Sequence, residues 1–314
     1  MTEQTGAARA VVDAVGQVTF GASMTFENLS MVPLVRADER NADYITLDEA
    51  IAAGLAHITE VSDAGRVSEL KIAVTGSMPV LLLDGEELLG AKQNRVLNLT
   101  ILAPPARTTV IPVSCVESGR WHHVSRGFAS SPRAQFAEGR AEKMRQVTAS
   151  LRSAGGRASD QGAVWDLIAQ KSSRLSATSD TSAMSAVFDK LDTPLEEFVA
   201  SFQPVEHQVG AIFLINGRRA GLELFDASST WSKLAPKLIR SYAVDAIDRR
   251  RQRTVNSGPT EAEAFTTSVA SSPASVFPGT GDGEDVRLSG TDIAGAALVA
   301  GGRAIHLSAF PINA

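Results

Sequence analysis

The stretch GAIFLINGRRAGLELF, residues 210–225, places two apolar arms on either side of an Asn-Gly pair. An Asn-Gly pair between apolar arms predicts a tight β-hairpin, because the favoured two-residue turn needs a positive φ at both central positions. A second stretch, GAALVAGGRAIHLSAF (295–310), aligns with the first without a gap and carries Gly-Gly at its turn. A third, VLLLDGEELLG (80–90), aligns more loosely around Asp-Gly. We therefore predict three related hairpins and an antiparallel sheet.

The rest of the chain alternates between strand-like and helix-like periodicity. Over residues 17–133, short segments rich in Val, Ile, Leu and Thr are separated by Gly, Pro or Asp, which predicts a β-rich part of the core domain. The intervals are too short for parallel crossovers, so an antiparallel meander is favoured. Apolar residues recur at helical spacing over 134–204, which predicts a helical insertion or subdomain. Residues 205–314 return to strands with one long helix and predict the α+β part of the core domain.

Local signals refine this organisation. We expect residues 1–16 to be a flexible N-terminus, and the Ser, Thr, Gly and Pro-rich residues 256–284 to be a long surface loop. Residues 46–61 have the pattern of a helix, with Thr46 as N-cap and Glu49 three residues on, the spacing of a capping box. The predicted fold class is α+β: an antiparallel sheet core built from the N-terminal meander and the C-terminal hairpins, with a helical insertion.

The composition restricts the function classes. A net charge of −5 argues against a general nucleic-acid-binding surface, because such surfaces carry a basic excess. The single cysteine, Cys115, excludes an intramolecular disulfide and a cysteine-rich zinc site. No segment approaches the ~18 consecutive apolar residues that span a bilayer, and the first residues lack the pattern of a secretory signal. We expect a cytoplasmic protein that binds neither nucleic acid nor membrane.

The stretch LLLDGEELLGAKQNR (81–95) concentrates hydrogen-bonding groups between two apolar segments. Two carboxylates and a polar run follow its turn: Glu86, Glu87, Lys92, Gln93, Asn94 and Arg95. In an extended chain Arg95 falls at the margin of an apolar face, where a guanidinium needs a carboxylate or phosphate partner. One interpretation is structural, with Glu86 or Glu87 as that partner. The other is a recess for an anionic or sugar-like ligand, with two cations for charge and two amides for directional hydrogen bonds.

Cys115 lies in TTVIPVSCVESGRWHH (108–123) and, counting alternately, shares a strand face with apolar residues and with Glu117. A cysteine in an apolar row is usually a small core residue. A nucleophilic thiol would need a lowered pKa and a nearby base, which His122 supplies only if the chain turns back at residues 118–119. The adjacent histidines His122 and His123 point apart on a strand, so we expect no metal site.

Cofactor motifs are missing from the chain. There is no Gly-rich phosphate loop, no Gly-x-Ser-x-Gly and no His-Glu-x-x-His. The common cofactor enzymes are therefore disfavoured, and we expect no bound cofactor.

Several segments resemble those of the ARPP-1 family, whose name records an association with ADP-ribosylglycohydrolases and rhodanese-phosphatase superfamily proteins. The segments are LDGEELLGAKQNR (83–95), IPVSCVESGRW (111–121), GAIFLINGRRAGLELFD (210–226) and LAPKLIRSYAVDAI (234–247). The resemblance covers residues 17 to 312, although the helical part and the 256–284 stretch match only in character. It implies a role near ADP-ribose or NAD-derived nucleotides.

The leading hypothesis is the binding, and processing by hydrolysis or group transfer, of a nucleotide or ADP-ribose-type metabolite. The candidate catalytic residues are Glu86, Glu87, Cys115 and Glu117, with Glu86 or Glu87 as the simplest general base. The candidate ligand-binding residues are Lys92, Gln93, Asn94, Arg95, Arg120 and His122. Two alternatives stay open: a Cys115-dependent hydrolase or transferase, and a non-enzymatic interaction module that uses the helical insertion. The expected partner is a small molecule, and homo-oligomer formation is left open.

Overall fold

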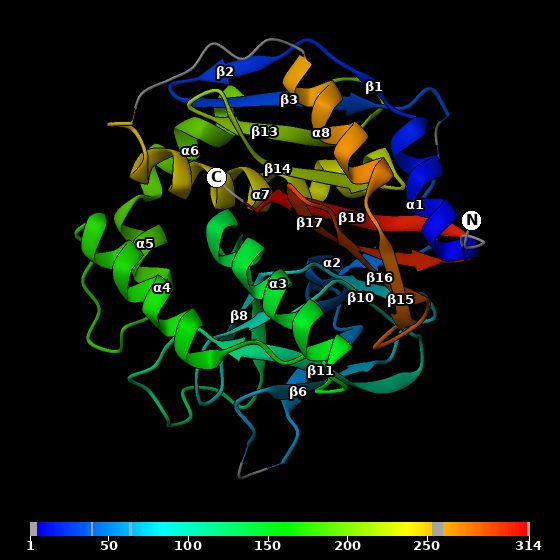
Figure 1. Ribbon diagram of the computed structural model, residues 1–314. Coiled ribbons are helices and arrows are strands. Elements are labelled where there is room, and N and C mark those ends of the chain that lie inside the picture. The colour runs from blue at the N-terminus through cyan, green and yellow to red at the C-terminus, as the bar shows by residue number, and fades with distance from the viewer. Residues whose placement is uncertain (1–4, 39, 63–64, 253–259, 313–314) are drawn as a thin grey trace. The chain divides into compact units, whose positions relative to one another are not determined.

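The computed structural model describes residues 5–38, 40–62, 65–252 and 260–312. The chain divides into two compact units, and each has its own β-structure (Figure 1). The first unit comprises Met1–Ala42, Glu197–Gly279 and Gly283–Ala314. The second comprises Asp43–Glu196 and Thr280–Asp282. The candidate residues of the sequence between 86 and 122 therefore all belong to the second unit.

The first unit is built on a nine-stranded antiparallel sheet in the order β1-β3-β13-β14-β18-β17-β16-β15, with β2 also paired to β3. Its strands are β1 (Thr19–Phe20), β2 (Met24–Phe26), β3 (Leu29–Val35), β13 (Gln208–Ile215), β14 (Arg218–Phe225), β15 (Ala274–Pro278), β16 (Glu284–Ser289), β17 (Ile293–Ala300) and β18 (Arg303–Pro311). The N-terminal strands and the C-terminal hairpins thus share one sheet, although the chain between them passes through the second unit.

The two aligned hairpins are confirmed. Asn216 and Gly217 connect β13 to β14 with φ values of 52° and 74°, and Gly301 and Gly302 connect β17 to β18 with φ values of 55° and 72°. Both turns have the two positive φ values that tight hairpins favour, which is why Asn and Gly occupy them. β14 also pairs with β18, so the two halves of the repeat lie side by side in the sheet.

Helices cover both faces of this sheet. They are α1 (Gly6–Gly16), α7 (Ser228–Asp248) and α8 (Thr260–Ser271), while α6 (Asp192–Ser201) spans the sequence boundary between the units. The side chains of α1 and α8 pack with Ile212, Leu214 and Leu222 in one apolar core. On the opposite face, Tyr242 of α7 stacks on Phe213 at a centroid distance of 4.0 Å.

The expectation of a flexible N-terminus at residues 1–16 is wrong, because α1 occupies most of it. Thr5 caps this helix by accepting a hydrogen bond from the Ala8 backbone N, and Ala7, Val11 and Val15 are buried in the core. These residues recur at helical spacing, a pattern that is weak because alanines provide much of it. Residues 1–4 lie outside the described part of the chain.

The expected surface loop at 256–284 is also wrong over its described part. Helix α8 and strand β15 fall within it, and residues 256–259 lie outside the described residues. Ala262, Phe265 and Val269 are buried at helical spacing, so a narrow apolar stripe holds a Ser and Thr-rich helix on the sheet. β15 is an edge strand, the place where a strand tolerates a proline such as Pro278 at its end.

The second unit contains a closed six-stranded barrel in the order β11-β6-β5-β12-β8-β9 and a three-stranded sheet in the order β10-β7-β4. Its strands are β4 (Ile45–Thr46), β5 (Ala56–Glu60), β6 (Glu69–Val74), β7 (Val80–Leu82), β8 (Glu86–Gly90), β9 (Arg95–Leu97), β10 (Ile101–Ala103), β11 (Arg107–Cys115) and β12 (Phe128–Ala134). Neighbours in the barrel are antiparallel, whereas β4 and β7 run parallel. The helices of this unit are α2 (Leu47–Ala52), α3 (Ala137–Arg152), α4 (Gln161–Arg174) and α5 (Ser185–Lys190).

The predicted α+β class, with an antiparallel core and a helical insertion, is confirmed. One hairpin is not. Strands β7 and β8 on either side of Asp84-Gly85 do not pair with each other: β7 pairs with β10 and β4, and β8 with β9 and β12. The turn instead carries the chain from the three-stranded sheet into the barrel. The tight reversal follows β8, at residues 91–94, where Ala91 has a φ of 40°.

The helix expected at 46–61 is shorter than its pattern indicated. The capping box of Thr46 and Glu49 is present, but α2 ends at Ala52 and the chain turns at Gly54, which has a φ of 69°. Glycine with a positive φ is a common helix terminator. The following residues form β5, paired with β6 along the barrel wall. This correction moves Glu60 from a helix to the end of a barrel strand.

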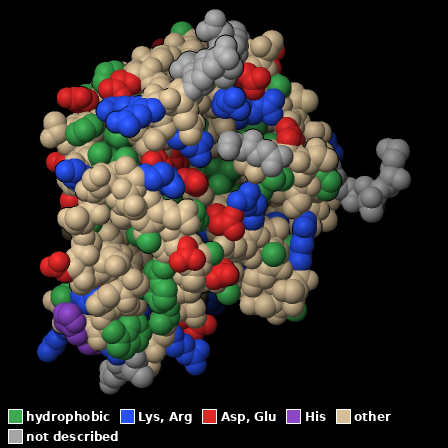
Figure 2. Space-filling model, turned by 60° about the vertical axis from the view of Figure 1, so that its left-hand side comes forward, with side chains coloured by type: hydrophobic (Ala, Val, Ile, Leu, Met, Phe, Trp, Pro, Cys, Tyr) green, Lys and Arg blue, Asp and Glu red, His purple; other side chains and the backbone are tan. Residues whose placement is uncertain are grey.

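On the face shown in Figure 2, acidic and basic side chains are interspersed and form no continuous basic stripe. None of the described helices is both long and apolar enough to cross a membrane. In the same residues, no group of three or more His, Cys, Asp or Glu side chains is placed to hold a metal ion.

Candidate functional site at one end of the barrel

The barrel interior is apolar along most of its length and polar at one end. Ile58, Leu97 and Val113 belong to the apolar core inside the barrel. Side chains two residues apart on a strand share a face, so Glu60, Arg95 and Cys115 project to the same side as these three. All three polar residues are buried, with exposed fractions of 8% for Glu60 and 0% for the other two. They form a polar layer where β5, β9 and β11 have their ends.

Arg95 is the central group of this layer. Its Nη1 donates to the Oε1 of Gln93 at 2.8 Å, while its Nε and Nη2 are buried and have no hydrogen-bond partner among the described residues. Burial lowers the pKa of Arg95, and the neighbouring Cys115 and Glu60 oppose that shift. An arginine remains charged in proteins, so the one N–H of Nε and the two of Nη2 are unused here.

Glu60 supplies the complementary group. Both of its carboxylate oxygens are buried without a hydrogen-bond partner in the described part of the chain. A buried polar group left unpaired costs free energy, so a carboxylate and a guanidinium that both have unused bonding capacity make this layer a candidate binding site. The Glu60 oxygens lie close to Gly65, where an added Cβ would be 3.2 Å from Oε2, and the φ of 73° at Gly65 also favours glycine.

An exposed tryptophan lies beside the polar layer. Trp121 is 47% exposed, and the Cζ of Arg95 lies 5.7 Å from the centroid of a Trp121 ring. The Nζ of Lys92 lies 5.3 Å from the same residue's ring centroid. Cations at these distances are attracted to the aromatic face. The end of the barrel thus presents an aromatic surface next to two cations and one carboxylate.

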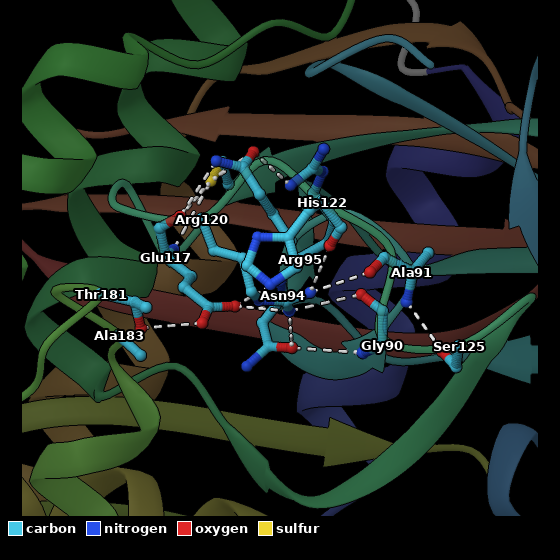
Figure 3. A network of polar contacts seen from close by, with 12 residues as sticks. Gly90, Ala91, Asn94, Arg95, Glu117, Arg120, His122, Ser125, Thr181 and Ala183 are labelled. Carbon is cyan, nitrogen blue, oxygen red and sulfur yellow. Dashed lines mark hydrogen bonds and ion pairs between the residues drawn. The ribbon is translucent and has the colours of Figure 1, made fainter. Parts of the chain in front are cut away.

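Glu117, Arg120 and Asn94 form a network that holds the 91–94 turn (Figure 3). Arg120 Nη2 donates to Glu117 Oε2 at 2.6 Å and to Asn94 Oδ1 at 3.1 Å, and its Nη1 donates to the Ala91 carbonyl at 2.8 Å. Thr181 Oγ1 donates to the second Glu117 oxygen at 2.8 Å.

These bonds also decide the ionisation of Glu117. Burial raises its pKa, but the hydrogen bonds from Arg120, the Asn94 backbone and Thr181 outweigh that effect, and the pKa is lowered. Glu117 is therefore a poor general base at neutral pH. We assign Glu117, Arg120 and Asn94 a positioning role: they fix the turn from which Gln93 reaches Arg95.

Cys115 is buried and its thiol does not reach the surface. Its Sγ donates to Gln93 Oε1 at 3.1 Å, and Gln161 of α4 binds both its backbone N and its carbonyl at 2.8 Å. Burial raises the pKa of the thiol, opposed by Arg95 among other groups. His122 is exposed, and its backbone carbonyl accepts a hydrogen bond from Arg120. Burial and the raised pKa weigh against a nucleophilic thiol.

The paired carboxylates of the sequence separate in the structure. Glu86 Oε2 accepts from the Leu83 backbone N at 3.2 Å, and Ser130 donates to Oε1 at 3.5 Å. Glu87 Oε2 accepts from Ser131 at 3.0 Å and lies 3.9 Å from Arg133 Nη1. The expectation that Glu86 or Glu87 pairs with Arg95 is therefore wrong. Adjacent residues on β8 point to opposite faces, and the partners of both carboxylates are other groups.

Glu87 has a raised pKa, although it does not pair with Arg95. Its desolvation by burial raises the pKa to about 7, against the opposing effects of Arg133 and Ser131. Its Oε1 is buried and has no hydrogen-bond partner among the described residues. It lies on the outer face of the barrel wall, away from Arg95, because it pairs with Val96 rather than with Arg95 on β9.

Two residues of the barrel end escaped the sequence analysis. Glu60 was hidden because residues 46–61 have the pattern of one helix, although AHITE alternates in the manner of a strand. Trp121 stands in the segment that carries Arg120 and His122, but its place over Arg95 depends on how the chain returns after β11.

Fold and site together define a class: an α+β protein of two units, one of which is a six-stranded barrel with a polar layer at one end. A family model described as ARPP-1, ARG and Rhodanese-Phosphatase-superfamily-associated Protein domain, matches residues 17–310. The chain belongs to this family, as its segments had indicated. Neither the search of curated proteins nor the search of solved structures found a match.

Proposed function

We propose that the barrel end binds a ribose-containing metabolite of the nucleotide, ADP-ribose or NAD-derived type. The observation that carries this proposal is the unused bonding capacity of Arg95 and Glu60, two buried and oppositely charged groups in one polar layer. Arg95 offers donors only and Glu60 acceptors only. A hydroxyl group accepts from the first and donates to the second, so a sugar diol satisfies both.

The surroundings of this pair suit the remainder of such a ligand. Trp121 provides an exposed aromatic face on which a base or the apolar face of a sugar stacks. Lys92 lies at the same tryptophan and supplies a cation for a phosphate. A simple anion fits the pair less well, because Glu60 would repel it. The family description also names an association with ARG, and the resemblance of the segments links that name to ADP-ribosylglycohydrolases, which supports the choice of ligand.

Processing of the ligand by hydrolysis or group transfer requires a general base. Glu60 is the carboxylate beside Arg95 whose oxygens are unpaired within the described residues, and it takes this role in our proposal. Glu87 has a pKa of about 7, which suits proton transfer at neutral pH, but it faces away from Arg95. Glu60 therefore replaces Glu86 and Glu87 as the candidate base.

Calorimetric titration with ADP-ribose, NAD, ribose 5-phosphate and inorganic phosphate at one ionic strength tests the proposal. We expect the ribose compounds to bind and Trp121→Ala to weaken them roughly tenfold, the size expected for loss of a base–aromatic stack. Glu60→Gln keeps the size of the side chain and removes its charge, and it should weaken binding as well. Val124→Ala, in the same exposed segment, is the matched control. Failure of all three ribose compounds to bind, or binding unchanged in both site variants, would overturn the proposal.

A further inference from the structure

The first unit contains a cavity of about 120 Å³ that the proposed function does not use. It lies where α1, the end of β3, the connection from β14 to α7 and the turn before β18 meet. Its polar lining is Asp13, Gln17, Arg36, Arg40, Asp226 and Arg303. These residues come from segments far apart in the sequence, and three of them are arginines.

The arginines are held in place by two aspartates. Arg36 is 6% exposed, and its Nη2 donates to the Asp226 carbonyl at 2.5 Å. Asp38 bridges Arg36 and Arg40. Its Oδ1 is 2.6 Å from Arg36 Nε, and its Oδ2 is 3.1 Å from Arg40 Nε. Asp38 therefore brings two guanidinium groups together at the cavity.

Arg303 is the first residue of β18. Its Nη1 lies 3.5 Å from Asp226 Oδ2, and its side chain is 25% exposed. Asp226 itself is 3% exposed and sits between Arg36 and Arg303, binding the first through its carbonyl and the second through its carboxylate. The cavity lining thus carries three cations and the carboxylates of Asp13 and Asp226, and Asp38 adds a third carboxylate beside Arg36 and Arg40.

We propose that this cavity is an oxyanion-binding site for inorganic phosphate or a phosphoryl group of a metabolite. Each guanidinium has five N–H donors in a fork that matches an oxyanion, and three such groups line one cavity. Like charges gathered in a partly buried place repel each other, and a bound anion offsets that repulsion.

A purely structural cluster would differ in one respect. Arginines that only tie the ends of β3, β14 and β18 together need no space between them. Here Arg40 and Arg303 keep exposed fractions of 41% and 25% at an open cavity. Space beside oriented donors is what a small oxyanion requires.

Titration calorimetry with inorganic phosphate and pyrophosphate, at an ionic strength held constant with sodium chloride, tests this site. We expect at least one of them to bind, and Arg40→Gln or Arg303→Gln to weaken it on the order of tenfold, the effect of losing a hydrogen bond to a charged group. Arg218→Gln is the control, because that arginine is exposed on the same sheet and lies outside the cavity lining. Circular dichroism verifies that each variant is folded.

Two further variants separate this site from the barrel end. Trp121→Ala should leave phosphate binding unchanged, whereas the Arg40→Gln, Arg303→Gln double variant should abolish it and leave binding of ribose compounds intact. Absence of phosphate and pyrophosphate binding to the wild-type protein overturns the proposal. So does binding that survives in the double variant, or that is lost in Trp121→Ala.

Discussion

The Nζ of Lys143 in α3 lies 3.0 Å from the Oδ1 of Asp84, and both side chains are buried. Arg140, one helical turn earlier, places its Nε 3.3 Å from the other oxygen of Asp84, and Lys143 also donates to the Leu97 carbonyl at 2.6 Å. The Asp84-Gly85 turn therefore anchors α3 to the barrel. Asp84 therefore has two roles: it occupies a turn position that favours aspartate, and it is the counter-charge that α3 packs against.

Asp84→Asn should destabilise the protein by about 3–5 kcal/mol, because it leaves two buried cations without their shared counter-charge. Urea unfolding followed by circular dichroism measures the free energy of unfolding. Glu69→Gln is the control: Glu69 forms an exposed pair with Arg66 at 2.9 Å, and loss of such a pair should cost about 0–1 kcal/mol. Equal losses in the two variants would contradict the anchoring role of Asp84.

Glu87 should make stability fall as pH rises from about 4.5 to about 7. Its pKa is about 7 in the folded protein, raised by burial from the ordinary value of 4.5, so the folded state binds more protons than the unfolded state in this window. The shift corresponds to about 3 kcal/mol lost across the window. Glu87→Gln should remove this component, so the difference between the two stability curves should change with pH. Parallel curves from pH 4 to pH 8 would argue against a raised pKa.

The thiol of Cys115 should react slowly in the native protein. It is fully buried, its pKa is raised by burial, and its Sγ donates to Gln93. A chromogenic disulfide reagent at neutral pH should modify it much faster in urea than in buffer. Rapid modification of the native protein would revive the hypothesis of a Cys115-dependent enzyme, and Cys115→Ser would then test whether activity depends on the thiol.

Gly221→Ala should destabilise the sheet of the first unit by about 1–3 kcal/mol through overpacking. An added Cβ would lie 2.1 Å from the hydroxyl of Tyr242, which is held in place because it donates to Glu223 Oε1 at 2.8 Å. Tyr242→Phe in the same chain should recover part of the loss, since it removes the clashing oxygen. Gly16→Ala, which meets nothing within 4 Å, should be close to neutral.

Part of the site was accessible from the sequence. The alternation of IPVSC predicted that Cys115 would face an apolar core, and Arg95 was expected at the margin of an apolar face. Both follow from the period of a strand, which is a property of neighbouring residues. The partner of Arg95 was not accessible, because Glu60 is brought near it by barrel closure rather than by the chain around 86–95.

The sequence by itself determined the features that depend on local backbone geometry. Asn216-Gly217 and Gly301-Gly302 form the expected turns because few other residues adopt two successive positive φ values, and Thr46 caps α2 because its oxygen reaches the Glu49 backbone N three residues on.

Only the tertiary structure decided which strands pair and which charges meet. Asp84-Gly85 has the chemistry of a hairpin turn, yet β7 and β8 part there because each finds other partners. The nearness of Glu60 to Arg95, and the gathering of Arg36, Arg40 and Arg303, likewise join segments far apart in the chain. Such contacts depend on the packing of the whole unit, which no short stretch of sequence encodes.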